Sequence, residues 1–277
     1  MNSGLTPTLA LIRDTFREAF ARRIFWGFAG CSTALLAFLV FIMRIDVVAG
    51  ALATVMIFGQ AMPSTDVQNL VQQTQSVIAM ALYFFGMALS VFASAGLVAA
   101  IFEPGRIELL LSKPVSRTQI LLGRYVGNVL VVAANIAYLT VGSWIIFGVK
   151  TGVWGGGFLF SSVYTTFVFA VLLAVIVLVG VLWESAAVAI MTTFGIMLVT
   201  PILAQRATIE RLLSADWSRD VVRVFYYVLP KTSDISVIIR HLILNLPVDS
   251  WMPVWSTALF GAVVLAAGIL HFRRRSF

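Results

Sequence analysis

The chain has 277 residues, of which 60% are hydrophobic and 11% are charged. A soluble domain carries about 25% charged residues, so this composition excludes an ordinary soluble protein. The net charge of +7 comes from Lys and Arg at the ends of apolar runs, a pattern typical of contact with lipid headgroups. We therefore expect membrane lipids as partners and no nucleic acid, which would need a basic face on a soluble module.

Several apolar runs are long enough to cross a bilayer, which takes roughly 20 residues in a helix. The sequence predicts an all-α integral membrane protein with six transmembrane helices in a single transmembrane domain, residues 1–277. Transmembrane barrels have short alternating segments instead of continuous apolar runs, so the pattern excludes a barrel. The expected spans are residues 24–43, 77–102, 117–149, 158–182, 185–204 and 251–270.

The first expected element is an amphipathic helix over residues 8–23, which begins after the helix-start signal Thr6-Pro7. Its apolar residues recur at steps of three and four, and Glu18 and Arg22 form a favourable i,i+4 pair. Because the first span follows directly, we expect this helix to lie in the headgroup plane. A solvated first helix is the alternative.

Residues 47–62 are apolar but too short for a span, and Pro63 closes them. We expect an interfacial or re-entrant piece here, followed by a polar loop that leads to the second span.

The stretch from Glu103 to Arg124 separates the second and third spans and carries charged residues of both signs. Pro104 ends the second span, because proline lacks the donor that a helix interior needs. Residues 106–112 can form barely two helical turns, and Pro114 disfavours their continuation. This pattern predicts a short helix between two spans.

Ser116 and Gln119 match a capping box, so we expect the third span to begin at Arg117. The short helix before it would then lie parallel to the membrane surface and could transmit force from a soluble partner into both spans.

This stretch resembles the first cytoplasmic loop of the permease subunits of ATP-binding-cassette (ABC) exporters of the type-2 family. The matching residues are Glu103, Gly105, Ile107, Leu110, Leu111, Pro114, Ser116, Arg117, Ile120, Leu121, Gly123 and Arg124. The amphipathic N-terminal helix, the six spans and the helices before the last span extend the resemblance over the whole chain. It implies a cytoplasmic coupling helix, and a working unit of two permease chains, expected to be identical, with two ATPase subunits.

The resemblance also implies which residues contact the ATPase. The expected coupling interface is Glu103, Arg106, Ile107, Leu110, Leu111, Lys113, Pro114 and Arg117. The sequence contains no phosphate-loop motif G-x-x-x-x-G-K-[ST], so ATP and Mg²⁺ belong to the partner subunit. We expect no catalytic residue, metal or cofactor in this chain.

Polar residues in the third span form a second group of candidates, which fall near one helical face. Such residues either hydrogen-bond to neighbouring helices or line a water-filled translocation path. They are Arg124, Asn128, Asn135 and Tyr138. Gly123 and Gly127 have the spacing that allows two helices to approach closely.

Glu184 lies at the expected cytoplasmic turn between the fourth and fifth spans, where it either contacts the ATPase or merely ends a helix. Glu103 could pair with Arg106 or Arg124, or pack against the N-terminal helix. Residues 205–250 are expected to form an extracytoplasmic loop with surface helices.

If the chain crosses the membrane six times, eleven basic residues fall on one side. They lie near the N-terminus, in the 103–124 stretch and at the C-terminus. The positive-inside rule makes that side cytoplasmic, so both termini are expected there, in the cytoplasmic (inner) membrane. Six further Lys and Arg in the last loop oppose this orientation.

The function that these observations favour is that of an exporter permease, or of a subunit that transmits mechanical force, driven by a separate ATPase. The alternatives are an integral-membrane enzyme acting on lipid, an ion-coupled carrier and a structural anchor. An enzyme needs clustered polar groups and a carrier usually has intramembrane acids, and the spans contain few of either. The cargo stays open.

Overall fold

The structure, a computed structural model, describes the backbone of residues 5–21, 23–42, 44–48, 52–57, 60–61, 65–99, 116–213 and 215–274. Its side chains are described over residues 11–21, 25–41, 66–96, 116–213 and 215–274. The expected coupling helix between the second and third spans lies outside the described residues.

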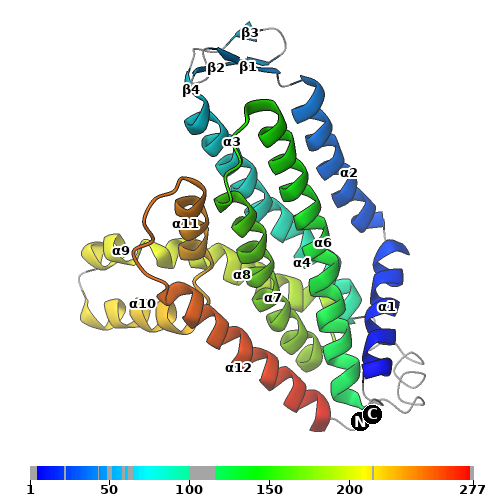
Figure 1. Ribbon diagram of the computed structural model, residues 1–277. Coiled ribbons are helices and arrows are strands. Elements are labelled where there is room, and N and C mark those ends of the chain that lie inside the picture. Colours follow the sequence, from blue (N-terminus) through cyan, green and yellow to red (C-terminus); the bar gives the residue numbers. More distant parts are fainter. Residues whose placement is uncertain are drawn as a thin grey trace.

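The described chain is an all-α membrane bundle apart from one small sheet (Figure 1). The helices are α1 (Leu5–Ala21), α2 (Arg23–Ala37), the π-helix η1 (Phe38–Ile42), α3 (Val67–Ala81), the π-helix η2 (Leu82–Gly86), α4 (Met87–Ala99), α6 (Arg117–Thr151), α7 (Gly157–Trp183), α8 (Ala186–Ala204), α9 (Arg206–Leu212), α10 (Asp216–Val228), α11 (Thr232–Ile243) and α12 (Met252–Arg274). The strands are β1 (Arg44–Val48), β2 (Leu52–Ile57), β3 (Gln60–Ala61) and β4 (Thr65–Asp66).

Five helical segments are long and apolar enough to cross a membrane: 67–96, α6, α7, α8 and α12. Helices α1 and α2, which are joined by a bend of 71°, add a sixth span if the bent pair is counted as one. The described helices therefore give five to six spans, where the sequence predicted six. The second helical segment begins at residue 67, ten residues before the expected span, because Asp66 caps it by accepting a hydrogen bond from the backbone N–H of Asn69 at 3.4 Å.

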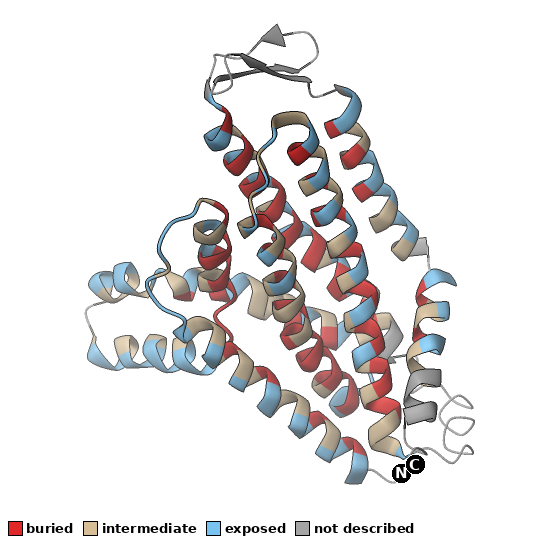
Figure 2. Ribbon diagram, viewed as in Figure 1, coloured by how far each residue is buried: buried red, intermediate tan, exposed pale blue. Residues whose placement is uncertain are grey.

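Helix α7 forms the centre of the bundle (Figure 2). It is apolar on all sides, a pattern typical of a helix surrounded by other helices. Phe169, Leu172 and Ile176 are fully buried, and α7 contacts α4, α6, α8, α11 and α12. In contrast, α8 and α12 leave most of their surface outside the described bundle.

Helix α6 runs beside α1 and α2 along much of its length. Leu11 lies against Gly123 and Leu36 against Gly142, so the two segments are aligned in parallel. At the far end, Lys150 Nζ donates hydrogen bonds to the carbonyl oxygens of Leu39 and Val40, at 2.7 and 2.8 Å. With 35 residues, α6 is about 52 Å long and exceeds a hydrocarbon layer of about 30 Å.

Strands replace the interfacial or re-entrant piece expected around residues 47–62. Strands β1 and β2 form an antiparallel pair, and β3 and β4 each pair with β2. Figure 1 places this sheet at the opposite end of the bundle from α1, the start of α6 and the end of α12.

The expected loop over residues 205–250 contains three helices with different surroundings. On α10, a stripe of apolar side chains that includes Trp217, Val221 and Val224 is exposed, as expected for a surface helix. Its polar face contacts α9, where Arg223 binds Glu210 through two hydrogen bonds of 3.0 and 3.2 Å. Helix α11 instead packs inside the bundle against α3, α7 and α8.

Candidate functional site

The third span begins where the capping-box pattern predicted. The backbone N–H of Gln119 donates to Ser116 Oγ at 3.2 Å, and the backbone N–H of Ser116 donates to Gln119 Oε1 at 3.0 Å. Arg117 is therefore the first residue of α6. The other residues of the expected coupling interface lie outside the described residues: Glu103, Arg106, Ile107, Leu110, Leu111, Lys113 and Pro114.

The first turns of α6 are joined to α1 through two glycines. A Cβ atom added to Gly123 would lie 2.9 Å from Leu11 Cβ, and one added to Gly127 would lie 2.7 Å from Thr15 Cβ. These separations are too short for two carbon atoms, so only glycine allows this approach. The glycine spacing seen in the sequence is thus used for helix packing.

The buried face of α1 carries small side chains. Thr15 and Ala19 are 2% and 3% exposed, whereas Phe20 is 47% exposed. Small side chains allow close packing on the glycines of α6, and the aromatic ring is left at the surface.

A buried ion pair joins the same two helices. Arg124 Nη1 donates to Glu18 Oε2 at 3.0 Å, and the side chains are 4% and 17% exposed. Arg124 Nε is buried and has no hydrogen-bond partner among the described residues. The sequence suggested Arg22 as the partner of Glu18, and the Arg22 side chain lies outside the described residues. Arg124 thus holds α1 against α6. Its other expected partner, Glu103, lies outside the described residues.

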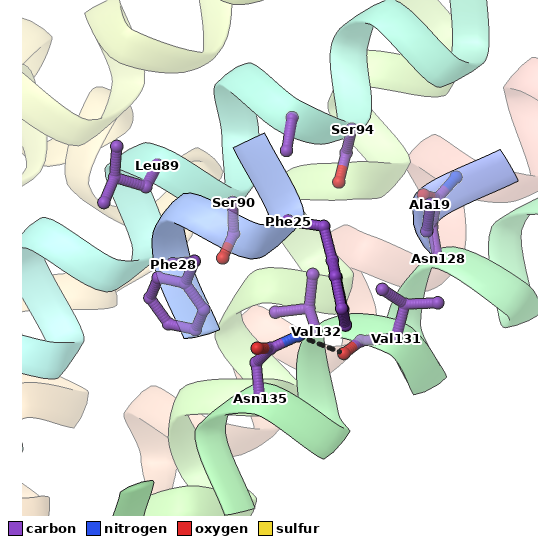
Figure 3. A pocket seen from close by; sticks show the side chains of 11 residues that line it. Ala19, Phe25, Phe28, Leu89, Ser90, Ser94, Asn128, Val131, Val132 and Asn135 are labelled. Atoms are coloured by element: carbon purple, nitrogen blue, oxygen red, sulfur yellow. Dashed lines mark hydrogen bonds between the residues drawn. The ribbon is translucent and has the colours of Figure 1, made fainter. Parts of the chain in front are cut away.

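Two of the predicted polar residues, Asn128 and Asn135, line a cavity between α1, α2, α4 and α6 (Figure 3). Both side chains are buried, and Asn135 Nδ2 donates to the carbonyl oxygen of Val131 at 3.2 Å. Ser90 and Ser94 of α4 face the same cavity. Its volume of about 40 Å³ has room for a few water molecules and is far below the several hundred Å³ of a ligand pocket.

Tyr138 is not part of this cavity. Its side chain is 47% exposed, and its hydroxyl lies 3.2 Å from Thr33 Oγ1 of α2. It therefore contributes to the contact between the first and third spans, as the helix-packing alternative expected.

Glu184 ends α7 in a left-handed conformation with φ of 52°. Its backbone N–H donates to the carbonyl oxygen of Gly180 at 2.9 Å, and Ser185 then caps α8. The side chain is exposed. Glu184 therefore ends a helix, and an additional contact with an ATPase stays a prediction.

A second polar cluster, at the start of α11, was not predicted from the sequence. Side chains from three membrane spans bind Lys231 and Thr232, two of them at the backbone. Tyr83 donates to the carbonyl oxygen of Thr232 at 2.6 Å, and the backbone N–H of Lys231 donates to Thr257 Oγ1 at 2.9 Å. The hydroxyls of Thr200 and Thr232 lie 2.6 Å apart.

The side chain of Lys231 is buried, 3% exposed, and its ammonium has no hydrogen-bond partner among the described residues. It lies 4.9 Å from the ring centre of Tyr226, and the Arg206 guanidinium lies 3.7 Å from the same ring centre. Burial lowers the pKa of Lys231. Burial and the hydrogen bond from its hydroxyl to Asp234 Oδ2 raise the pKa of Tyr226 to about 12.

The only sequence signal for this cluster is a lysine between Pro230 and Asp234, after two tyrosines. In the sequence this segment indicates only a break between two surface helices, because nothing in the pattern shows which spans surround it.

The described side chains contain no group of three or more His, Cys, Asp or Glu residues that could hold a metal ion. The structure thus brings together features of helix packing and electrostatics. At one end of α6 these are a glycine contact and a buried ion pair, and at the start of α11 they are hydrogen bonds from neighbouring spans.

Residues 9–277 match the family model described as ABC-2 family transporter protein. No curated protein matches the chain. The match covers nearly the whole sequence and includes every span, the α1–α6 contact and the cluster at α11. The chain therefore belongs to the ABC-2 family of transporter proteins and is a multi-pass membrane permease subunit of a type-2 ABC transporter.

Proposed function

We propose that this chain exports a substrate, or transmits mechanical force, across the cytoplasmic membrane with energy from ATP hydrolysis in a separate subunit. Two ATPase subunits would dock on the 103–117 loop of two permease chains and would carry the ATP and Mg²⁺. The observation that carries this proposal is the packing of α1 on the first turns of α6, directly after that loop.

This packing supports force transmission because it is short-ranged and buried. The contacts at Gly123 and Gly127 leave no space for α1 to slide, and the Arg124–Glu18 pair fixes its register. A push on Arg117 would then move α1 and α6 together, without loss in a flexible joint.

The distribution of charge supports a cytoplasmic position for this end of the bundle. Arg13 and Arg17 of α1, Arg117 at the start of α6, and Arg273 and Arg274 at the end of α12 share it. Figure 1 places these three helix ends together. Under the positive-inside rule, both termini would lie in the cytoplasm.

Exposed residues of α8 support a second permease copy. Met191 and Leu198 are 73% and 69% exposed, and Gly195 between them has no atom within 4 Å of its Cβ position. A small residue in an exposed stripe allows another helix to approach closely. We expect Leu198→Cys in a Cys31→Ser background to form a disulfide-linked dimer in membranes, whereas Val263→Cys on the exposed face of α12 should not.

Docking on the 103–117 loop is tested by purifying the tagged chain from its host membranes and detecting ABC ATPases by mass spectrometry. Leu110→Asp places a charge on the apolar side of the expected coupling helix, and Arg117→Glu reverses the charge at the start of α6. Both should reduce ATPase recovery at least tenfold, equivalent to about 1.4 kcal/mol of binding free energy.

The matched control is Arg211→Glu on α9, where an exposed arginine lies far from this end of the bundle. It should leave recovery unchanged. Equal recovery with all three variants would refute docking at this loop. Labelling gives a second test. In a Cys31→Ser background, Lys113→Cys should not react with a membrane-impermeant maleimide added to intact cells, and a reaction would refute docking at this loop.

A further inference from the structure

An open groove of about 520 Å³ runs between α3 with η2 on one side and α11 on the other. One end of it is fixed by the hydrogen bond from the Tyr83 hydroxyl to the carbonyl oxygen of Thr232. The groove is separate from the α1–α6 contact and from the cavity at Asn128.

One part of the groove is apolar and exposed. Val77, Phe84 and Phe85 of α3 and η2 are 67%, 44% and 74% exposed, and Val237 of α11 is 52% exposed. Phe84 and Phe85 are adjacent residues of the π-helix η2. Within a membrane span, such a surface contacts hydrocarbon chains.

The other part is polar and cationic, with Gln73, Ser76 and Arg240. These residues lie at the same level of the bundle, because the end of α11 and the middle of α3 both lie near the start of α7. Gly157 lies next to the carbonyl oxygen of Leu242, and the Cβ position of Gly155 is 3.8 Å from Gln75 Oε1. The groove thus changes from cationic to apolar along the direction of the helices.

The exposed guanidinium of Arg240 forms no ion pair with any described carboxylate. Arg240 lies three residues before the end of α11, and the following loop leads to Trp251, which is 43% exposed at the start of the last span. Tryptophan at the end of a span marks the headgroup level of a bilayer. An anionic group at this level would therefore complement Arg240.

We propose that the groove is a binding site for an anionic phospholipid. Its phosphate is bound by Arg240 beside Gln73 and Ser76, and one acyl chain lies along Val77, Phe84 and Phe85. The polar and apolar parts of the groove follow each other in the same order as headgroup and chain in a lipid. A second copy of this chain would have to bury the arginine, and a soluble ligand would have no reason to cover aromatic rings inside a span.

The site would connect the second span to α11. Helix α3 continues through η2 and α4 as far as Ala99, and the start of α11 is bound to spans two, five and six. A lipid in the groove would add to the link that the Tyr83–Thr232 hydrogen bond already forms between the second span and α11.

The test is native mass spectrometry of the purified chain with dioleoyl phosphatidylglycerol and, separately, dioleoyl phosphatidylcholine. The wild-type chain should bind the anionic lipid several-fold more tightly. Arg240→Gln should weaken binding of the anionic lipid about tenfold and remove the preference, because it deletes the charge-assisted bonds to phosphate. Ala81→Trp, which fills the apolar part of the groove, should weaken binding of both lipids.

The matched controls are Arg211→Gln, an exposed arginine on α9, and Ala262→Trp on the exposed face of α12. Both should bind lipid as the wild-type chain does. The proposal is overturned if Arg240→Gln keeps the preference for the anionic lipid, or if Arg211→Gln loses it equally. Because both altered arginines are exposed, thermal melting should be unchanged in each.

A second copy as the occupant would give a different result. In a Cys31→Ser background, Val237→Cys would form an efficient disulfide-linked dimer in membranes, and this outcome would also overturn the lipid assignment.

Discussion

The buried ion pair between Glu18 and Arg124 predicts a large and non-additive effect of substitution. Removing one partner of a buried pair costs about 3–5 kcal/mol, because the remaining charge has no counter-ion. Arg124 is 4% exposed and its Nε already lacks a partner, so Glu18→Leu should cost about 3 kcal/mol in the free energy of unfolding. Arg124→Met should cost less, about 2 kcal/mol, because Glu18 at 17% exposure keeps some contact with water.

The double variant Glu18→Leu with Arg124→Met should lie close to the wild-type chain. Exchanging both charges for apolar side chains removes the cost of burying them, and the glycine contacts of α1 with α6 stay intact. The coupling energy between the two positions is therefore expected to be about 5 kcal/mol in magnitude.

The assay is a double-mutant cycle, with unfolding by denaturing detergent followed by circular dichroism in mixed micelles. The control cycle uses Asp216 and Arg219 on α10, whose side chains are 93% and 36% exposed at an N–O distance of 3.1 Å. It should give a coupling energy below about 1 kcal/mol, as for other exposed pairs. Additive effects of the Glu18 and Arg124 substitutions would refute the argument that this pair holds the two helices together.

Three further effects follow from the geometry. Gly127→Leu should lower the unfolding free energy by about 1–3 kcal/mol through its clash with Thr15, measured as above, whereas Gly30→Ala inside α2, with nothing within 4 Å, should raise it by up to about 1 kcal/mol. Lys231→Met should raise the melting temperature, because it removes a buried ammonium that has no hydrogen-bond partner among the described residues. Since burial lowers the pKa of Lys231, the folded chain binds this proton more weakly than the unfolded chain. The stability of the wild-type chain should therefore rise with pH from the lowered pKa up to 10.5, and its difference in melting temperature from Lys231→Met should narrow over the same range. A difference that does not change with pH would contradict the expectation that the lysine is charged below its pKa. Glu184→Gly should stabilise the chain by about 1 kcal/mol, since glycine adopts positive φ without strain, and an unchanged or lower melting temperature would argue that the carboxylate makes a stabilising contact.

Much of the fold follows from local sequence signals. The helix start at Ser116 depends on two side chains three residues apart, and the turn at Glu184 is the only polar break in a long apolar stretch. Both are properties of a short segment, so the sequence alone predicts them.

The partners of polar residues could not be predicted in the same way. The sequence placed Arg124 on an inward face, but its bond to Glu18 spans 106 positions and depends on how α1 packs. The cluster at Lys231 likewise needs side chains from three spans. The strands at residues 44–66 depend on pairing between segments, whereas a hydrophobicity pattern reports only burial.

The hydrogen bonds from Lys150 have a consequence for motion. They attach the end of α6 to the end of the first span, while the glycines attach its beginning to α1. Because the contacts hold both ends, we expect these three helices to shift together as one block. Any movement of this block relative to α7 must then pass through the linker at residues 152–156, which Trp144 Nε1 holds on α6 by donating to the carbonyl oxygen of Gly155 at 3.1 Å, so the linker would transmit the movement to the central helix.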